Sequence, residues 1–405
     1  MDFNDKLDRL AKLAVGFGLS LKPGQELVMT ADIGARDLAN RITRAAYAAG
    51  AANVVTFYSD DAAVLAKYTH GADAAIDTAP GWLFDAMAGA FNAGAARLAI
   101  AGDTPGLLAG QDPARVARAN KARAQAAKPM LDAIVSGKVN WNIVPFVTEG
   151  WAHQVFPGLT RDAAVERLWE HVFEALRLDQ PGDPVAAWKA HFAELGRRRD
   201  VLNAARFDAL HFVGGGTDLT VGLAKGHTWV GGGNTLADGT PYAPNLPTEE
   251  VFTMPDRART EGRAVFTKPA VIGGSIVEGL VVEFARGKAV SIEADTGADV
   301  ARGHFATDEG ASRLGEVALV AESSPIARSG VLYFNTLFDE NAACHIAFGN
   351  AYAMNLAEGA DRVQAGMNES QIHHDCMIGG PEIQVTGIAA DGARVPVMEN
   401  GEFVI

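Results

Sequence analysis

The sequence predicts an α/β domain with a parallel sheet, followed by an α+β, strand-rich domain. Over residues 1–200, short apolar segments alternate with stretches of helical periodicity, which is the pattern of strand-helix-strand units in a parallel sheet. After residue 200, Gly and Thr become frequent and short β-prone segments replace the helical periodicity. The 405 residues suffice for two or three domains at about 150 residues each. We therefore predict two domains, residues 1–200 and 201–405.

Helices and strands are expected to alternate in the first domain. Apolar residues from Phe3 to Phe17 recur at three- and four-residue steps, which predicts an opening helix that Gly18 ends. The later expected elements are a strand at 27–29, a helix at 35–49, a strand at 53–58, a helix at 81–92, a strand at 97–101, a helix at 112–136, a strand at 142–146 and a helical region at 151–199.

In the second domain, β-prone segments lie at 271–276, 280–284 and 372–377. Two glycine clusters, 214–216 and 231–233, match neither of the common phosphate-binding patterns, GxGxxG and GxxxxGK[ST]. Because glycine adopts backbone conformations closed to other residues, we interpret both clusters as tight turns between strands.

Composition excludes several classes of protein. The chain has 35 Lys and Arg against 49 Asp and Glu, a net charge of −14, which disfavours nucleic acid as a partner. Two cysteines, Cys344 and Cys376, are too few for a disulfide framework or a Cys-rich zinc module, and they fit a reducing compartment. Neither a signal-peptide pattern nor an apolar run of about 18 residues occurs. We expect a cytoplasmic protein that does not bind membranes.

The segment 372–377 contains a candidate metal-binding pair. Side chains two residues apart on a strand share a face, so His373 and Asp375 are expected to point the same way and His374 the other. Imidazole and carboxylate groups are common ligands of divalent metals. The alternative is an ordinary exposed or hydrogen-bonded His-x-Asp pair.

Other titratable residues each allow two interpretations. His345 lies in an apolar stretch, where it is either a core histidine with one hydrogen-bond partner or a metal ligand. Glu316 is the only charge between Leu314 and Val320, so it faces solvent on a helix or has a strong buried partner such as a metal. Glu249 and Glu250 follow Pro247 and Thr248, which is also a helix-capping pattern.

Taken together, these residues are the inventory of a two-metal hydrolase. Two divalent ions about 3.5–4 Å apart need a bridging carboxylate together with terminal carboxylates and imidazoles from several chain segments. Glutamates, histidines and an aspartate of this kind are spread over the second half of the chain, without an HExxH motif.

Four strings carry a family resemblance: NLPTEEVFTMPDR from Asn245, RLGEVALV from Arg313, FNTLFDENAACHIAFGNAY from Phe334 and ESQIHHDCMIG from Glu369. In this order and spacing they resemble the thermophilic aminopeptidases, dinuclear metallopeptidases of the aminopeptidase T and aminopeptidase S type. The resemblance implies a leucine-preferring, broad-specificity aminopeptidase, a cytoplasmic homodimer with its metal site in the C-terminal domain. The N-terminal domain or the dimer would then limit access to peptides with a free N-terminus.

The resemblance also implies a ligand set for two divalent ions per subunit: Zn, Co or Mn, with Mg possible. The matching residues are Glu250, Glu316, His345, Tyr352, His373 and Asp375. We expect Glu316 and Asp375 to bridge, Tyr352 to ligate weakly or donate to the oxyanion, and a metal-bridged hydroxide to attack the carbonyl. Glu249, Asp339 and Glu340 are candidates for supporting the ligands or binding the substrate amine, although a structural role is expected for each. His374 and Cys376 depart from the apolar or aromatic residues that the family pattern leads us to expect.

Two alternatives remain open at this stage. A related metal-dependent amidase or esterase would use the same metals on a non-peptide substrate, because the pocket decides what is hydrolysed. A non-catalytic protein would bind a small ligand through the α/β half and use the carboxylate cluster as a structural metal site.

Overall fold

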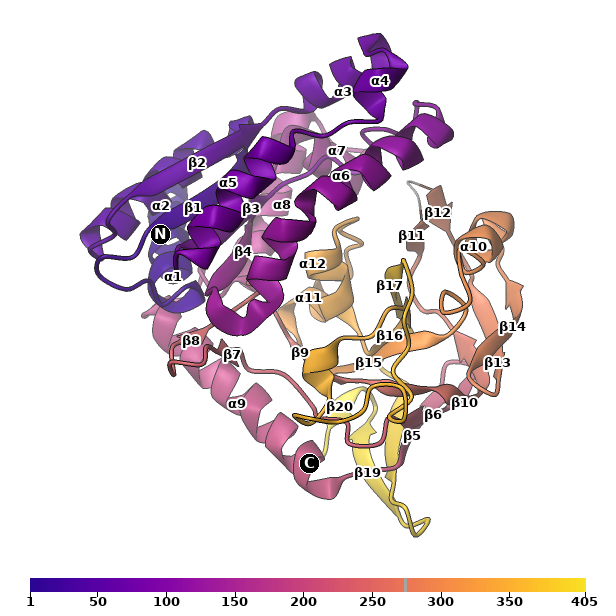
Figure 1. The fold of residues 1–405 in the computed structure, drawn as a ribbon. Coiled ribbons are helices and arrows are strands. Elements are labelled where there is room, and N and C mark those ends of the chain that lie inside the picture. Colours follow the sequence, from indigo (N-terminus) through magenta and orange to yellow (C-terminus); the bar gives the residue numbers. More distant parts are fainter. Residues whose placement is uncertain (273–274) are drawn as a thin grey trace. The chain divides into compact units, whose positions relative to one another are not determined.

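The structure is a computed structural model that describes residues 1–272 and 275–405, and the chain forms two compact units. Unit 1 comprises Met1–Lys189 and Gly233–Pro247, and unit 2 comprises Ala190–Gly232 and Thr248–Ile405. The boundary expected near residue 200 falls within helix α9 (Pro184–Ala205), whose residues belong to both units. Figure 1 labels the elements described below.

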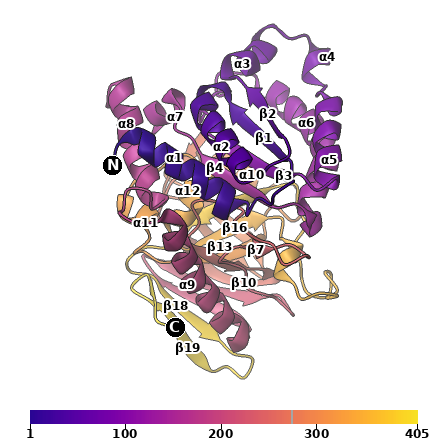
Figure 2. The ribbon, with the colours of Figure 1, turned by 90° about the vertical axis from the view of Figure 1, so that its left-hand side faces the viewer.

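Unit 1 is built on a four-stranded parallel sheet, which confirms the predicted α/β class. The strand order is β2-β1-β3-β4, with β1 (Leu27–Asp32), β2 (Val54–Ser59), β3 (Ala96–Ala101) and β4 (Trp141–Pro145). Figure 2 shows α1 and α2 on one face of this sheet and α5 and α6 on the other. On the second face, Val28 packs in one apolar cluster with Met87 and Phe91. Both faces are covered, as parallel sheets require.

The predicted helices of unit 1 are present, and two more occur. The helices are α1 (Phe3–Leu13), α2 (Arg36–Ala48), α3 (Asp61–His70), α4 (Asp73–Ile76), α5 (Gly81–Asn92), α6 (Pro113–Ala133), α7 (Glu149–Val155) and α8 (Arg161–Ala175). The region predicted as helical at 151–199 consists of α7, α8 and α9 with loops between them. Among the described residues, no helix is both long and apolar enough to cross a bilayer.

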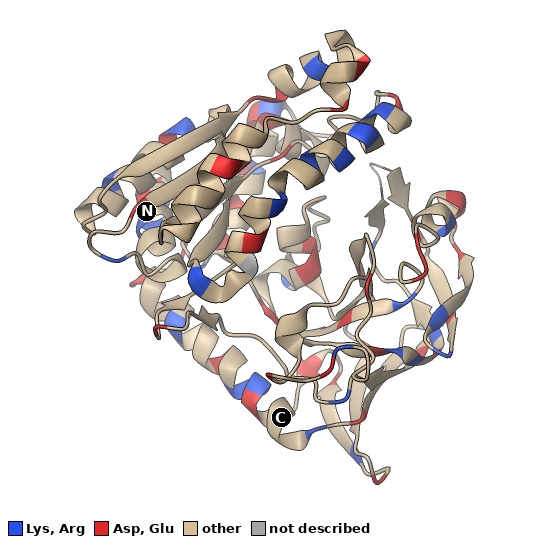
Figure 3. Ribbon diagram, viewed as in Figure 1, with Lys and Arg blue, Asp and Glu red and all other residues tan. Residues whose placement is uncertain are grey.

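Basic residues follow one another along α6, as Figure 3 shows. Arg115 lies 2.6 Å from Asp73, and Arg118 lies 2.7 Å from Asp77. These ion pairs join α6 to the short helix α4 and its C-terminal end. The guanidinium groups of Arg115 and Arg118 are therefore engaged within unit 1.

Unit 2 is built on two large antiparallel sheets, in agreement with the predicted strand-rich class. The larger has the order β14-β13-β10-β6-β5-β18-β19-β20: β5 (Ala209–Gly214), β6 (Thr217–Leu223), β10 (Pro255–Val265), β13 (Val281–Ala285), β14 (Lys288–Glu293), β18 (Gln384–Ile388), β19 (Arg394–Glu399) and β20 (Glu402–Phe403). The smaller has the order β17-β16-β15-β9: β9 (Glu250–Thr253), β15 (Leu314–Val320), β16 (His345–Gly349) and β17 (His373–Met377). Phe212 and Leu219 of the first sheet share one core with Val317 and Ile346 of the second.

The remaining elements of both units are short. In unit 1, β7 (Asn234–Thr235) pairs with β8 (Pro241–Tyr242). In unit 2, β11 (Ala270–Ile272) pairs antiparallel with β12 (Ser275–Val277), and residues 273–274 of the strand predicted at 271–276 lie outside the described residues. The other helices of unit 2 are α10 (Ala298–His304), α11 (Pro325–Ser329) and α12 (Thr336–Asp339), the last followed by a 3-10 turn at Glu340–Ala342.

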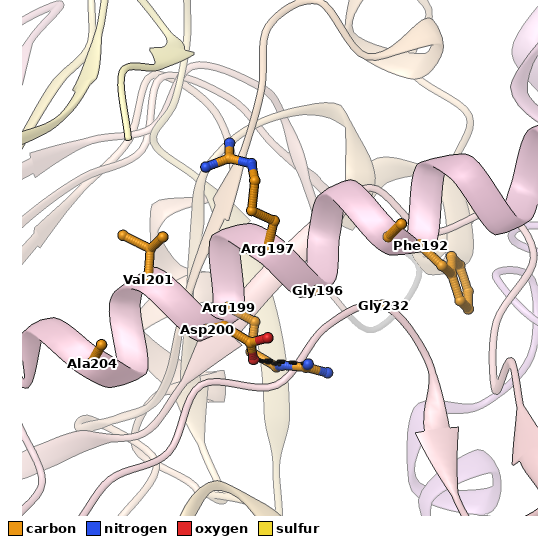
Figure 4. A pocket seen from close by; sticks show the side chains of 9 residues that line it. Phe192, Gly196, Arg197, Arg199, Asp200, Val201, Ala204 and Gly232 are labelled. Carbon is orange, nitrogen blue, oxygen red and sulfur yellow. Dashed lines mark hydrogen bonds and ion pairs between the residues drawn. The ribbon is translucent and has the colours of Figure 1, made fainter.

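The two glycine clusters have different structural roles. Gly215 and Gly216, with φ of 58° and 88°, form the two-residue turn between β5 and β6, as predicted. The second cluster is not a hairpin turn, because its chain passes close to β9 and α9. A Cβ on Gly231 would lie 2.7 Å from a methyl of Val251, and one on Gly232 would lie 2.6 Å from the carbonyl of Phe192. Figure 4 shows this passage of Gly232 beside α9.

A β-bulge in β15 changes which face its side chains occupy. Leu314 pairs with Phe348, but Glu316 pairs with the next residue of β16, Ala347, so Gly315 is an extra residue. Leu314 and Val317 both lie in the apolar core although they are three residues apart, an odd step that a regular strand does not allow. Glu316 therefore lies on the opposite face from the core.

We predict that Gly315→Ala destabilises the protein. The new Cβ would lie 2.4 Å from the carbonyl oxygens of both Gly349 and Asn350, which are backbone atoms that cannot rotate away. The expected loss is about 1–3 kcal/mol of unfolding free energy, seen as a lower thermal midpoint. The control is Gly303→Ala in α10, where a Cβ meets nothing within 4 Å and alanine favours the helix. Equal midpoints for the two variants would contradict this role of the bulge.

Candidate metal centre

Five of the predicted ligands lie on one face of the smaller sheet of unit 2. Its four adjacent strands supply Glu250 from β9, Glu316 from β15, His345 from β16, and His373 and Asp375 from β17. Register explains their convergence. Glu316 is paired through Ala347 with Asp375, while His345 and Glu250 are paired with Ala318 and Val320 of β15. These positions alternate with core-facing residues, so one sheet face is apolar and the other carries the titratable groups.

The ligand atoms form two overlapping groups. Glu250, Glu316 and His345 make one group, and Glu316, His373 and Asp375 make the other, each with its atoms within 4.8 Å of one another. His345 Nε2 lies 3.3 Å from Glu250 Oε2 and 3.6 Å from Glu316 Oε1. His373 Nε2 lies 3.7 Å from Glu316 Oε2 and 3.4 Å from Asp375 Oδ1. Glu316 thus presents one oxygen to each imidazole.

Both imidazoles are oriented by backbone carbonyl groups. His345 Nδ1 lies 3.2 Å from the carbonyl of Ala343, and His373 Nδ1 lies 2.7 Å from the carbonyl of Asn350. A proton on Nδ1 donates to the carbonyl, which leaves Nε2 as the ring nitrogen that faces the carboxylates. Metal-ligating histidines are commonly held in this way.

Burial and neighbouring charges shift the pKa values of this cluster in opposite directions. Burial raises the pKa of Glu316 to about 7, against the effect of its hydrogen bond with His345. Burial opposes the charge of His373, but the hydrogen bond to Asp375 and the surrounding carboxylates raise its pKa to about 9. The pKa of Asp375 is below its usual value, because His373 and His345 outweigh its burial.

The donor set fits a divalent metal. Glu316 is 5% exposed and His345 1%, so each needs a compensating partner. Glu250 Oε2 is buried without a hydrogen bond, although His345 Nε2 lies 3.3 Å away. Carboxylate and imidazole donors together suit Zn, Co or Mn, and the oxygen-rich set also suits Mg.

These contacts decide between the interpretations that the sequence left open. Glu316 lies on a buried strand, so the exposed helical position considered for it is wrong. Glu250 begins a strand, so the helix-capping interpretation is also wrong. His345 faces three carboxylates and is not an isolated core histidine.

Tyr352 and Glu340 border the cluster without belonging to either ligand group. The ring of Tyr352 lies 4.7 Å from that of His373 and is 41% exposed. Burial and the nearby carboxylates raise its pKa, which keeps the phenol protonated and able to donate. Burial and the carboxylates of Glu250 and Asp375 likewise hold the pKa of Glu340 well above its usual value.

Glu249 and Asp339 make structural contacts instead. Glu249 lies 3.3 Å from His191 Nε2 of α9, and its backbone N–H donates to Asn341 Oδ1 at 2.7 Å. The Asp339 carboxylate accepts backbone N–H groups from Tyr333 at 2.8 Å and Asn335 at 2.9 Å. The structural role that the sequence favours for both residues agrees with these contacts.

The two residues that depart from the family pattern belong to neither ligand group. His374 contacts the rings of His304 and Phe305, and burial lowers its pKa to about 4. Cys376 is buried in the core, where burial raises its pKa well above the usual value. Both side chains therefore remain neutral at physiological pH.

A small cavity of about 190 Å³ adjoins the ligands. Its lining includes His373, Asp375 and Glu340, and an apolar wall. The apolar wall consists of Pro269, Ala270, Val271, Phe334 and Met377. Phe334 was not predicted from the sequence as a site residue, nor were Asn350 and Gly315 predicted to support His373 and Glu316. The signal in the sequence for the role of Gly315 was its position directly before Glu316, the only charged residue between Leu314 and Val320.

A larger, shallower hollow of about 680 Å³ lies along α9 and contains none of the predicted ligands. Its basic residues have acidic neighbours: Arg197 lies 2.7 Å from Glu194, and Arg199 lies 2.8 Å from Asp200, the pair drawn in Figure 4. Arg198 also contacts Glu194, at 3.0 Å. The basic cluster at 197–199 is therefore locally neutralised.

Comparisons with known proteins agree over almost the whole chain. The family model described as thermophilic metalloprotease (M29) matches residues 3–403. Aminopeptidase T of Thermus thermophilus is 49% identical over 407 residues, covering 100% of this chain and 99% of that protein. Aminopeptidase PepS of Streptococcus thermophilus is 40% identical over 410 residues, with 100% and 99% coverage.

A solved structure has the same fold. Wild-type AmpT from Thermus thermophilus aligns with a TM-score of 0.96 and 48% sequence identity over 100% of both chains. The family match and the full-length relatives agree with the resemblance of the four sequence strings. This chain belongs to the thermophilic metalloprotease family, M29.

Proposed function

We propose that this metallo-aminopeptidase uses Glu250, Glu316, His345, His373 and Asp375 to hold two divalent ions. The observation that carries the proposal is the pair of overlapping ligand groups with Glu316 in both. A carboxylate with one oxygen toward each imidazole is suited to bridging two ions. Asp375 Oδ1, 3.4 Å from one imidazole and 4.0 Å from the other, is the second candidate bridge.

The bound ions would supply Lewis-acid polarisation of the substrate carbonyl and a lowered pKa for a shared water. The chain's own residues then orient the substrate. Tyr352 keeps its phenolic proton and donates to the oxygen on which negative charge develops. Asn350 and Ala343 keep the imidazole rings fixed through their carbonyl groups.

Glu340 is the pocket carboxyl best suited to the substrate's free amine. It lines the cavity beside His373 and Asp375 but is in neither ligand group. Burial and the carboxylates of Glu250 and Asp375 raise its pKa, and the same carboxylates would stabilise a positive charge placed beside it. We propose that Glu340 holds the α-ammonium group and thereby selects peptides with a free N-terminus.

The apolar wall of the cavity supports the proposed preference for leucine with broad tolerance of other side chains. Membership of a metalloprotease family argues against the alternative of a non-catalytic binding protein. The homodimer, the cytoplasmic location and the role of unit 1 in limiting access stay predictions from the sequence resemblance.

We predict that Glu316→Gln removes most activity. An amide cannot bridge two cations as a carboxylate does, so kcat/KM on leucyl substrates should fall at least about 100-fold, roughly 2.7 kcal/mol of barrier. Metal content of the purified protein, measured by elemental analysis, should fall as well. Glu309→Gln is the control, because Glu309 is exposed and its partner Arg257 is 4.0 Å away. A Glu316→Gln turnover within about tenfold of the unchanged enzyme would mean that the assignment is wrong.

Metal removal should abolish activity reversibly. After chelation, hydrolysis of leucine anilide should stop, and add-back of Zn, Co, Mn or Mg singly should identify the ions that restore it. N-acetyl-leucine anilide should not be cleaved by any restored form, since it lacks the cation that Glu340 would hold. Efficient cleavage of the acetylated compound would favour an amidase of wider scope.

Glu340→Gln should weaken substrate binding more than it slows turnover. Loss of the carboxylate charge is expected to raise KM for leucine anilide about tenfold or more, with kcat much less affected. Glu358→Gln, at an exposed position outside the cavity, is the control. A fall in kcat at constant KM would instead assign Glu340 to proton transfer.

A further inference from the structure

The cavity beside the ligands has one wall whose backbone is held in an unusual conformation. Phe334 has a φ of 53°, in the left-handed region that bulky residues seldom occupy. Such conformations persist where the surrounding structure enforces them, and they often occur at functional sites. Phe334 also lines the cavity, which it shares with His373 and Asp375.

Asp339 enforces this conformation. One of its carboxylate oxygens accepts the N–H of Tyr333 at 2.8 Å, and the other accepts the N–H of Asn335 at 2.9 Å. These amides flank Phe334 in the chain, so the carboxylate fixes the backbone on both sides of it. Successive amides directed at one anion form a compact nest. Asp339 is 7% exposed, so its carboxylate has little access to water as an alternative partner.

The cavity has the size and lining of a subsite for one side chain. Its volume is about 190 Å³, while an apolar cavity of about 150 Å³ is enough to bind benzene. Pro269, Val271 and Met377 complete the apolar wall with Phe334. The titratable residues that line the same cavity are Asp339, Glu340, His373, His374 and Asp375. A substrate with its amine at Glu340 would place the side chain of its first residue against this wall.

We propose that Phe334 is a specificity-determining residue that contacts the side chain of the substrate's N-terminal residue, and that Asp339 is its positioning residue. The inference rests on the proposed aminopeptidase function and adds the source of its side-chain preference. Apolar N-terminal residues gain contact with the Phe334 ring, whereas glycine and alanine do not reach it. Asp339 acts through the backbone at 333–335 and does not contact the substrate.

The test compares kcat/KM for the anilides of glycine, alanine, leucine and phenylalanine. In Phe334→Ala, the ratio of leucine to alanine should fall about tenfold or more, while the value for alanine changes little. Phe334→Leu keeps an apolar wall and should keep most of the ratio. Phe3→Ala is the matched control, since Phe3 packs on Trp169 and Phe173 in unit 1.

The variant Asp339→Asn tests whether Asp339 positions Phe334 or only stabilises the fold. The amide keeps one acceptor oxygen but turns an NH₂ group toward the other backbone N–H, so Phe334 is no longer fixed on both sides. The leucine-to-alanine ratio should fall, and adding Phe334→Ala to this variant should lower the ratio no further. A merely structural role would reduce kcat/KM for all four anilides by one common factor.

The outcomes are distinguishable. If the unchanged enzyme cleaves leucine anilide and Phe334→Ala leaves the ratio intact, the subsite inference is wrong and the aminopeptidase function stands. If the unchanged, metal-loaded enzyme cleaves no anilide with a free amine, the proposed function is wrong and this inference falls with it. Should Phe334→Ala fail to fold, Phe334→Gly accommodates the left-handed backbone and removes the same ring.

Discussion

The buried charges on the polar face of the small sheet must be balanced, and the local structure of the site follows from that requirement. Among the described residues, Glu250, Glu316 and Asp375 form ion pairs with the imidazoles of His345 and His373, and Glu340 is close enough to respond to their charges. Leaving a buried carboxylate uncompensated costs several kcal/mol, roughly the whole stability margin of many domains. Divalent cations would meet this requirement where the imidazole nitrogens and carboxylate oxygens converge. The opposite face of the same strands is packed in the apolar core, which fixes the sheet that carries the ligands.

Much of unit 1 could be predicted because each element has its own local pattern. The helix at 81–92 and the strands on either side of it required only apolar periodicity and a terminating glycine. The exceptions have a physical reason. Helix α3 has no buried residue, so its sequence carries no periodic apolar stripe, and α4 is a single turn. The second glycine cluster was misinterpreted because its cause, the close approach of α9 and β9, is contact between segments distant in sequence.

The positions of site residues could be predicted where the residues lie on one strand. His373 and Asp375 share a face because they are two residues apart, and His374 accordingly lies among apolar and imidazole rings. The sheet face that Glu316 occupies could not be predicted by counting alternate residues from Leu314, because the bulge at Gly315 reverses the alternation of side chains between the two faces. That bulge fits against the backbone of Gly349 and Asn350, and Asn350 also orients His373. Family resemblance supplied Glu316 and Glu250 as ligands, whereas the strand pairing that brings them together is a property of the folded chain.

The same excess of negative charge that makes the site suited to metals also explains how one cavity can recognise the end of a peptide. Within the pocket, Glu340 remains outside the ligand groups, and burial together with the carboxylates around it raises its pKa. A protonated α-amine brings a positive charge to this position, whereas an internal peptide nitrogen or an acetylated terminus brings none. Phe334 lines this cavity of about 190 Å³, and Asp339 fixes the backbone on both sides of Phe334. In the proposed mechanism, charge selects the terminus and apolar contact selects the residue, so that hydrolysis and specificity would depend on neighbouring groups of one sheet and one short turn.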